Sequence, residues 1–313
     1  MGIALVAALA LAPVAQANAT VDRSSRSSVR TTYLTLFAPA IATPTGWTGS
    51  VVNCNAGTTS TASQKATLTA VNYVRALAGL SPVKLSASYT AKAQKAAEVF
   101  KVNSTSRSLY LTHALPSTVK CYSNDARIAA AHSNLAASTD SRVSGAKAVI
   151  GYLDDLGASN HAVGHRRWLL SPDLGAIGAG STSTTNALYV AGASAKTYRN
   201  PSWVTWPTSG YFPSQLEPSG RWSISGKQGL RYDFSKAKIT VVNAKGTRLK
   251  VTKYALANGM TYSDTVVFAV SGLTVPKNSS VAKYTVTISG VKHAKKTVKT
   301  YRYTVSLFDP TKG

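Results

Sequence analysis

A glycine-punctuated apolar run, Leu174-Gly-Ala-Ile-Gly-Ala-Gly180, most constrains the fold of this chain. We interpret it as a buried strand, because the glycines around Ile177 would let neighbouring backbone approach closely. Two histidines and two arginines precede the run, within Asn160-His-Ala-Val-Gly-His-Arg-Arg-Trp-Leu-Leu-Ser-Pro172. Since titratable side chains here lead directly into a buried strand, a functional site can be built at this point of the chain.

Hydrophobic patterning divides the chain into a helical part and a β part, and its 313 residues suffice for two domains. Segments with helical spacing of apolar residues are 64–80, 86–100, 125–137 and 143–156. Two strands are expected next, at 176–182 and 186–193. Beyond Pro201 the helical period disappears, and strand-like alternation occurs at 237–242, 265–270, 284–288 and 299–306. We therefore expect an α+β protein whose C-terminal part is a small all-β sandwich.

The N-terminal residues predict export. Residues 3–14 form an apolar run that ends in Ala15-Gln-Ala17, with Ala17-Asn-Ala19 as a second candidate, so residues 1–19 are expected to be a signal peptide. The run is too short for a stable membrane anchor, and no later stretch predicts a transmembrane segment. Residues 20–63 are rich in Ser, Thr, Ala and Gly and predict a flexible arm, with the option of a short strand at 33–37. The mature chain is expected to be secreted.

Cys54 and Cys121 are the only cysteines. In an oxidising compartment they most simply form one disulfide, the alternative being two unpaired buried thiols.

The formal charge of +24 results from a scarcity of acidic residues, since Glu98 and Glu217 are the only glutamates. From Arg221 onward the chain has 17 basic and 3 acidic residues, which makes the β part strongly basic. We expect association with anionic cell-envelope polymers, such as teichoic acids or acidic lipids, and no specific recognition of nucleic acid. The alternative is a charged surface that only aids solubility.

Six short motifs occur in one order along residues 64–193. They are Asn72-Tyr-Val-Arg75, Ala93-Gln94 with Ala97, Thr112-His113, Asn134-Leu-Ala136, Gly164-His-Arg-Arg-Trp168 and Ile177-Gly-Ala-Gly180. In this order they resemble bacterial members of the CAP superfamily, which comprises cysteine-rich secretory, antigen 5 and pathogenesis-related proteins. The resemblance implies an α-β-α sandwich with a central cavity over residues 64–200. It also implies an immunoglobulin-like β-sandwich module over residues 201–313.

In this family the cavity is often lined by two histidines and two acidic residues, and some members bind a divalent metal there. By position, His113 and His165 match the histidines, and Ser133 stands where the first glutamate is usual. Asp155 has the spacing of the second acidic residue, with Asp154 as the alternative. Two imidazoles and a carboxylate suit Zn²⁺, so we expect Zn²⁺ at His113 and His165. The alternative is that buried histidines only satisfy hydrogen bonds.

The remaining titratable residues leave alternatives open. Arg166 or Arg167 could bind an anionic ligand, but the stronger interpretation pairs one of them with a carboxylate such as Asp155 or Asp173.

Three more histidines are weaker candidates. His132 could face the cavity or solvent, and His293 is expected at the surface. His161 stands at helical ligand spacing from His165, although Gly164 argues against one continuous helix.

We expect a secreted, non-catalytic protein that binds a small molecule, a lipid or a divalent metal in its cavity. The missing glutamate at Ser133 favours binding over catalysis. The rival hypothesis is a metal-assisted extracellular hydrolase of peptide or cell-wall material. A catalytic triad of Ser133, a histidine and Asp155 can be drawn, but no nucleophile elbow surrounds Ser133. The third hypothesis is a structural or adhesive protein with a vestigial cavity.

Overall fold

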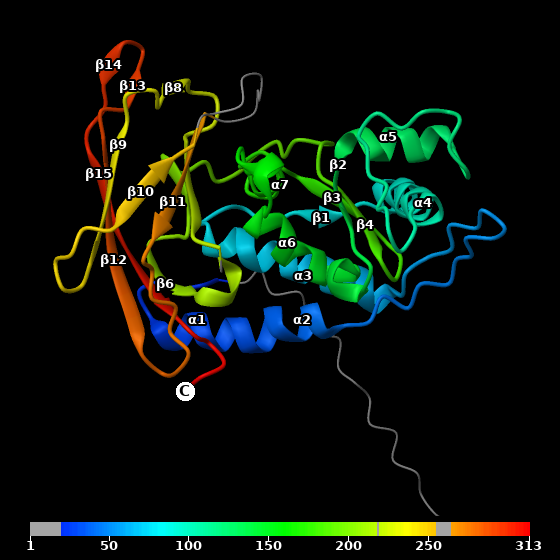
Figure 1. Ribbon diagram of the computed structural model, residues 1–313, viewed down its shortest axis with the longest axis horizontal. Helices are drawn as coiled ribbons and strands as arrows, with labels where there is room; N and C mark the ends of the chain where they lie inside the picture. Colours follow the sequence, from blue (N-terminus) through cyan, green and yellow to red (C-terminus); the bar gives the residue numbers. More distant parts are fainter. Residues whose placement is uncertain (1–19, 218, 255–263) are drawn as a thin grey trace, which may run out of the picture.

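A computed structural model describes residues 20–217, 219–254 and 264–313. The predicted signal peptide at residues 1–19 lies outside them. Two parts lie side by side: a helical part built around a small sheet, and a β part built mainly from two facing sheets (Figure 1). Buried apolar residues of both parts, such as Val71 and Val286, belong to one continuous core. The two parts therefore share a buried interior.

The helical part has a helix in each segment where the patterning predicts one, although the segment predicted at 143–156 is α-helical only over 148–154. Its elements are α3 (Thr61–Leu77), α4 (Ala87–Asn103), α5 (Asn124–His132), η2 (Ser141–Val143), η3 (Gly145–Lys147), α6 (Ala148–Asp154), η4 (Ala158–Asn160) and α7 (Gly164–Leu169). Helices α3, α4 and α5 each follow a serine, Ser60, Ser86 and Ser123, whose hydroxyl accepts a backbone N–H of the first turn. The helices predicted at 64–80 and 86–100 are confirmed.

The sheet of the helical part has the strand order β1-β3-β4-β2. Its strands are β1 (Lys84–Leu85), β2 (Ser133–Ala137), β3 (Ala176–Ser181) and β4 (Thr185–Tyr189). On one face, Ala187 and Tyr189 pack in a core with α4 and α5. On the other face, Ile177 and Leu188 pack in the core that holds α3 and α6. The predicted α-β-α sandwich is confirmed, and so are the strands predicted near 176–182 and 186–193, the second ending earlier.

The glycines of β3 bring the backbone of α4 onto the sheet. A Cβ added to Gly178 would lie within 2.6 Å of backbone atoms of Tyr89 and Thr90. One added to Gly180 would lie within 2.4 Å of backbone atoms of Ala93 and Gln94. No side chain fits at either position, so this close helix–sheet approach is the physical reason for the glycine-punctuated run.

The helix predicted at 125–137 is wrong in its second half. Helix α5 ends at His132, whose Nδ1 lies 2.7 Å from the Ile128 carbonyl oxygen. From Ser133 the chain pairs antiparallel with β4 as strand β2. Apolar residues in this short segment suit either structure, and the long-range pairing with β4 decides the outcome.

The predicted flexible arm at residues 20–63 is also wrong for its first half. Residues 26–42 are helical, as α1 (Arg26–Thr32), the π-helical η1 (Tyr33–Phe37) and α2 (Ala38–Ala42), so the optional strand at 33–37 is absent. Val29, Tyr33 and Phe37 recur every four residues and are buried, and the Phe37 ring lies 5.1 Å from the Tyr73 ring of α3. This segment runs along both parts of the molecule (Figure 1).

The β part is a sandwich of two sheets. The first has the order β10-β11-β7-β5, with β5 (Trp203–Trp206), β7 (Arg221–Gly226), β10 (Lys250–Lys253) and β11 (Thr265–Ser271). The second has the order β6-β15-β12-β9, with β6 (Gly210–Pro213), β9 (Lys238–Asn243), β12 (Val281–Ser289) and β15 (Tyr301–Phe308). The Trp222 ring of the first sheet lies 6.1 Å from the Tyr284 ring of the second. The predicted sandwich and its four predicted strands are therefore confirmed.

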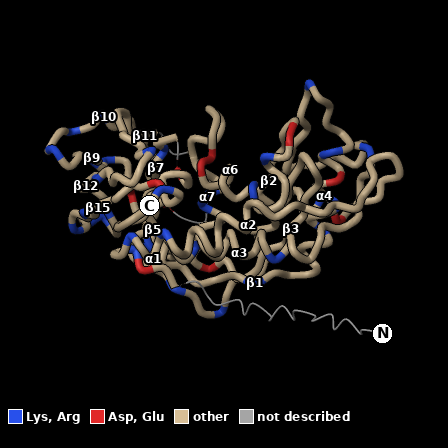
Figure 2. Tube along the Cα trace, turned by 90° about the horizontal axis from the view of Figure 1, so that it is seen from below, with Lys and Arg blue, Asp and Glu red and all other residues tan. Residues whose placement is uncertain are grey.

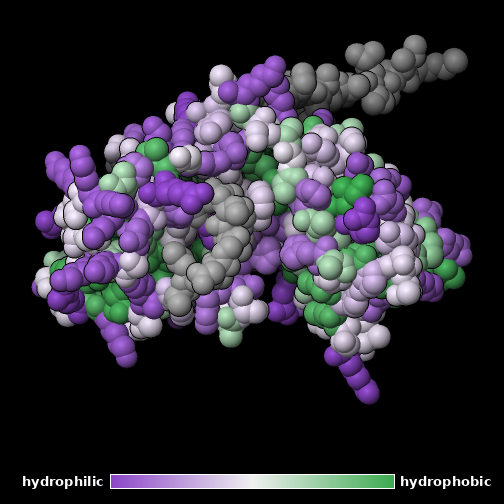
Figure 3. Space-filling view, turned by 90° about the horizontal axis from the view of Figure 1, so that it is seen from above, coloured by the Kyte–Doolittle hydropathy of each residue, from purple (hydrophilic) through white to green (hydrophobic). Residues whose placement is uncertain are grey.

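Smaller elements complete the β part. They are η5 (Ser214–Leu216) and a minor sheet of β8 (Tyr232–Asp233), β13 (Lys292–His293) and β14 (Lys296–Thr297). Lys and Arg positions are spread along the strands of this part, and acidic positions there are few (Figure 2). Long hydrophilic side chains project from its surface (Figure 3).

Candidate functional site

A cleft of about 410 Å³ opens beside α7 and gathers residues from four separate segments. We call it the histidine cleft. Its titratable and polar lining includes His113, His132, Ser133, Asn134, Asn160 and His165. Trp168, Val190 and Ala191 supply apolar lining. Of the four cavity residues that the sequence predicted, His113, Ser133 and His165 line this cleft.

Asp155, the fourth predicted residue, lies behind His165 rather than in the cleft wall. Its side chain is fully buried, and Oδ1 lies 2.7 Å from Nδ1 of His165. Its Oδ2 accepts the backbone N–H of Arg166 at 3.2 Å. Asp155 caps α6 in the left-handed conformation, with φ of 52°, and this turn aims the carboxylate at α7. Asp155 therefore positions the imidazole and is not itself presented to a ligand.

Each of the three histidines of the cleft has its Nδ1 within hydrogen-bond distance of a protein oxygen. Nδ1 of His113 lies 2.8 Å from the Ala130 carbonyl oxygen, and Nδ1 of His132 bonds the Ile128 carbonyl oxygen. A carbonyl or carboxylate oxygen only accepts, so in each ring Nδ1 carries the proton and donates it. In the neutral rings Nε2 is left as an acceptor. The cleft thus holds three imidazoles whose second nitrogen is free of the anchoring bond.

Ser133 and Asn134 begin strand β2 at the floor of the cleft. The Ser133 hydroxyl is buried and has no hydrogen-bond partner among the described residues. Asn134 Nδ2 donates to the His165 carbonyl oxygen at 3.0 Å, and the Tyr152 hydroxyl donates to the Asn134 carbonyl oxygen at 3.0 Å. Asn134 therefore fixes the backbone of α7 against β2, while Ser133 leaves one polar atom unsatisfied.

The described residues do not assemble a three-donor zinc site. Within residues 20–217, 219–254 and 264–313, no group of three or more His, Cys, Asp or Glu is arranged to hold a metal ion. The carboxylate of Asp155 is taken up by His165 and by the Arg166 backbone. For Zn²⁺, the predicted pair His113 and His165 would be the protein donors, with an anchored Nδ1 in each ring, as is usual for metal-binding histidines.

Arg166 ties the site to the β part through a carboxylate that the sequence did not indicate. Its Nη2 lies 2.6 Å from Oε2 of Glu217, and both side chains are buried. Its Nη1 donates to the Arg221 carbonyl oxygen and to the Ser223 hydroxyl. One of the two arginines therefore pairs with a carboxylate, as expected, and the ion-pair partner of Arg166 is Glu217 rather than Asp155 or Asp173. Glu217 lies 51 residues away, so local spacing gave no signal for it.

Burial perturbs this junction strongly. It raises the pKa of Glu217 to about 8 against the opposing attraction of Arg166, and the nearby Asp154 contributes to the rise. Asp154, the alternative cavity carboxylate, is buried with Oδ1 unpartnered among the described residues, and it does not line the cleft. Asp154 is therefore part of the junction with the β part.

The other two histidines are not in the cleft. The His161 ring stacks on the Tyr254 ring at 4.4 Å, and the Arg221 guanidinium lies 5.6 Å from the centre of the same Tyr254 ring. His161 follows the end of η4 and His165 lies in α7, so the helical ligand spacing between them is not realised. His293 is half-buried in the β part and bonds the Arg231 carbonyl oxygen.

The motif Asn72-Tyr-Val-Arg75 lies in α3 and holds the segments that flank α7 and β1. The Asn72 side chain both accepts from the Val83 N–H and donates to the Val83 carbonyl oxygen. The fully buried Arg75 guanidinium donates to four carbonyl oxygens, those of Ser81, Leu169, Ser171 and Leu174. Burial lowers the pKa of Arg75 to about 10, and Asp173 opposes this shift. Arg75 therefore satisfies backbone carbonyl groups in the segment between α7 and β3, where no helix or strand partner among the described residues does so.

Cys54 and Cys121 form a disulfide, as the sequence predicted. No helix of the described residues is both long and apolar enough to cross a membrane.

Comparison with known families assigns the segment that contains the histidine cleft to a family. Residues 68–198 match the model of the CAP family, described as the cysteine-rich secretory protein family. The matched segment contains all four predicted cavity residues, so the resemblance to the CAP superfamily is confirmed over this range. No curated protein and no solved structure matches the chain significantly.

Proposed function

Residues 68–198 form a CAP domain, and from this premise we propose that the protein binds a small polar ligand or a divalent metal ion in the histidine cleft without converting it. One observation carries the proposal. His165 lines the cleft with its Nδ1 held at 2.7 Å by the buried carboxylate of Asp155, a bond that does not use Nε2. A fixed ring with one available acceptor is suited to binding.

The lining defines the ligand's chemistry. Imidazole Nε2 atoms accept hydrogen bonds or bind metal, and the Ser133 hydroxyl can donate or accept. Trp168 and Val190 flank these groups with apolar surface. A small molecule with hydroxyl or amine donors and an apolar flank fits this arrangement, and so does a lipid headgroup. Zn²⁺ is the metal candidate, held by His113 and His165 with water, because imidazole nitrogen is an ordinary Zn²⁺ ligand.

Binding without turnover is supported by the state of Ser133. A serine nucleophile needs a histidine within hydrogen-bond reach, and the Ser133 hydroxyl has no such partner in the described part of the chain. The position of the usual family glutamate therefore holds a hydroxyl that is neither paired nor activated.

Hydrolysis is the second candidate, and the His165–Asp155 pair is the observation that favours it. A histidine oriented by a buried carboxylate is the ordinary arrangement of a general base. Zymography with casein and with peptidoglycan tests this candidate. Activity that disappears in His165→Ala and persists in His293→Ala would show that the protein is a hydrolase rather than a binding protein.

We also propose secretion and association with the anionic cell envelope. The disulfide fits an oxidising compartment. The outer face of the second sheet carries the exposed residues Lys238, Lys283 and Arg302 among threonines. We call these three residues the basic sheet face. A flat surface with spaced cations fits a phosphate-bearing polymer.

Sedimentation with anionic phosphatidylglycerol vesicles tests the basic sheet face. Replacing its three residues by Gln should weaken sedimentation at low salt. Replacing Lys65, Lys84 and Lys147, which are exposed on the helical part, removes the same charge and is the matched control. Equal losses in both triple variants would mean that net charge alone attracts the protein.

Isothermal calorimetry with Zn²⁺, and ligand-observed NMR with a fragment panel of alcohols and amines, test the histidine cleft. Binding should weaken about tenfold or more in His165→Ala and remain unchanged in His293→Ala. The proposal would be refuted if every probe bound His165→Ala as tightly as the wild type.

A further inference from the structure

A second cleft of about 760 Å³ lies beside α4 and shares no lining residue with the histidine cleft. Its walls come from residues 48–58, from Lys95 and Glu98 of α4, and from residues 121–123. We call it the Glu98 cleft. It is not part of the site proposed above, so a function for it goes beyond that proposal.

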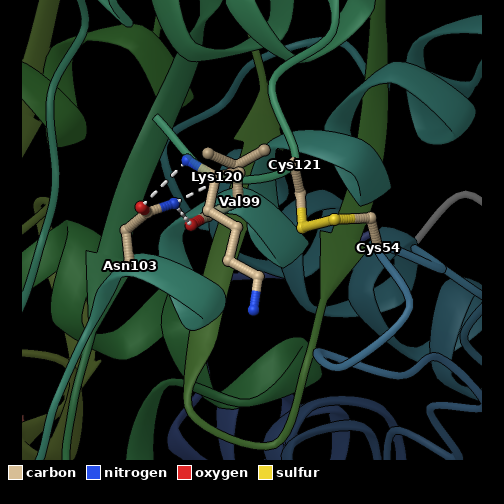
Figure 4. The surroundings of a disulfide bond; sticks show 5 residues. All are labelled: Cys54, Val99, Asn103, Lys120 and Cys121. Atoms are coloured by element: carbon tan, nitrogen blue, oxygen red, sulfur yellow. Dashed lines mark hydrogen bonds between the residues drawn. A yellow bond between two sulfur atoms is a disulfide. The ribbon is translucent and has the colours of Figure 1, made fainter. Parts of the chain in front are cut away.

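The walls of the Glu98 cleft are held in place by covalent and hydrogen bonds. The Cys54–Cys121 disulfide joins two of them (Figure 4). Asn103, at the end of α4, donates from Nδ2 to the Val99 and Lys120 carbonyl oxygens and accepts the Lys120 N–H (Figure 4). The segment leading to Cys121 is therefore fixed on α4.

The opposite wall, residues 48–58, is a folded turn rather than a loose loop. Ser50 and Asn55 exchange two backbone hydrogen bonds of 2.8 and 3.1 Å. The Ala56 carbonyl oxygen accepts from the Trp47 indole at 2.8 Å and from Gln94 of α4 at 3.0 Å. Gly57 has φ of +56°, and a Cβ there would collide with the backbone of Gly49. The walls of the cleft are therefore preformed.

The cleft has an acidic group without a neighbouring partner in the described part of the chain, although the chain as a whole is basic. Lys95 is its lining cation, and its Nζ is paired with Oδ2 of Asp125 at 2.7 Å. Glu98 is 3% exposed, and its Oε1 is buried with no hydrogen-bond partner among the described residues. A buried carboxylate oxygen without a partner is costly, and a cationic donor would remove that cost. The cleft thus has one unopposed acidic group.

We propose that the Glu98 cleft binds the primary ammonium group of a small organic amine, with the Glu98 carboxylate as its ion-pair partner. An ammonium group needs one carboxylate and neutral acceptors, and Thr48, Thr58 and Ser123 supply hydroxyls in the lining. A metal ion would need several acidic or imidazole donors, and the described residues bring no three together. An anionic ligand would meet Glu98 directly.

Calorimetric titration of the full-length His165→Ala protein, in which the histidine cleft is impaired, with 1-aminopentane, and with 1-pentanol as the uncharged analogue, tests the proposal. The amine should bind and the alcohol should not. Glu98→Gln, which keeps the shape of the side chain, should weaken amine binding roughly tenfold or more, the ordinary loss for a charged hydrogen bond. Asp140→Asn, at an exposed carboxylate outside this cleft, should change nothing.

Two further readouts distinguish the site from a folding effect. Burial raises the pKa of Glu98, so amine binding should strengthen as pH rises and the carboxyl ionises. Reduction of Cys54–Cys121 should weaken binding, because it frees one wall. Glu98→Gln should melt no lower than the wild type, since it removes a buried charge without a partner. Equal binding of 1-pentanol, or full amine binding by Glu98→Gln, would overturn the proposal.

Discussion

The contact between α4 and β3 gives the sharpest prediction for stability. In Gly180→Ala the new Cβ would stand 2.1 Å from the Ala93 carbonyl carbon, whereas ordinary contact begins at 3.4 Å. The helix or the strand must therefore move by roughly 1.3 Å, the difference of these two distances. The opposing atoms are backbone, so no rotamer change can relieve the contact. We expect a loss of about 3 kcal/mol, the upper end for overpacking.

Gly151→Ala is the matched control for this prediction. Gly151 lies in α6, and a Cβ there meets nothing within 4 Å. Alanine in an exposed helix position is more favourable than glycine by about 0.5–1 kcal/mol, so this variant should gain stability.

Urea denaturation followed by circular dichroism compares the two glycine variants with the wild type. The midpoint should fall in Gly180→Ala and rise in Gly151→Ala, with unchanged slopes. If Gly180→Ala is as stable as the wild type, α4 does not rest on the backbone of β3, and the explanation of the glycine run is wrong.

Three other perturbations have defined outcomes. Cys54→Ser with Cys121→Ser should lower the free energy of unfolding by about 4 kcal/mol, because a loop of 67 residues is no longer closed, and denaturant titration measures this. Burial raises the pKa of Glu217 to about 8, above the ordinary 4.5, so its stabilisation is complete below about pH 4.5 and is lost as pH rises through about 8. Melting temperatures across this range should therefore fall more steeply in the wild type than in Glu217→Gln, and parallel curves would refute the shift. Asp155→Asn should weaken Zn²⁺ binding about 10–100-fold, because the carboxylate that holds Nδ1 of His165 is lost, and unchanged calorimetric affinity would show that Asp155 does not position His165.

The sequence predicted those parts of the fold that rest on local patterns. Helical spacing in α3 and α4, alternation in the β strands and the glycines of β3 each depend on residues close together in the chain. The flexible arm was a wrong interpretation because composition outweighed the four-residue spacing of Val29, Tyr33 and Phe37. Strand β2 was missed because its pairing with β4 lies about 50 residues away.

The site was predictable as far as its residue types follow the family motifs. His113, Ser133 and His165 were predicted and do line one cleft. The position of Asp155 behind His165 depends on a left-handed turn, which no spacing rule gives. Glu217 and Glu98 were visible only as the two glutamates of a basic chain. Their surroundings come from packing between distant segments, so only the structure shows that each is buried.

The most direct test of the proposed binding site is the protonation pattern of His165, read from long-range ¹H–¹⁵N correlation spectra. Its resonances are assigned by their loss in His165→Gln. We predict that Nδ1 carries the proton in the neutral ring, held by Asp155, and that added Zn²⁺ or a binding fragment shifts Nε2. A proton on Nε2, or an Nε2 resonance that no probe moves, would contradict the assignment of the histidine cleft as a ligand site.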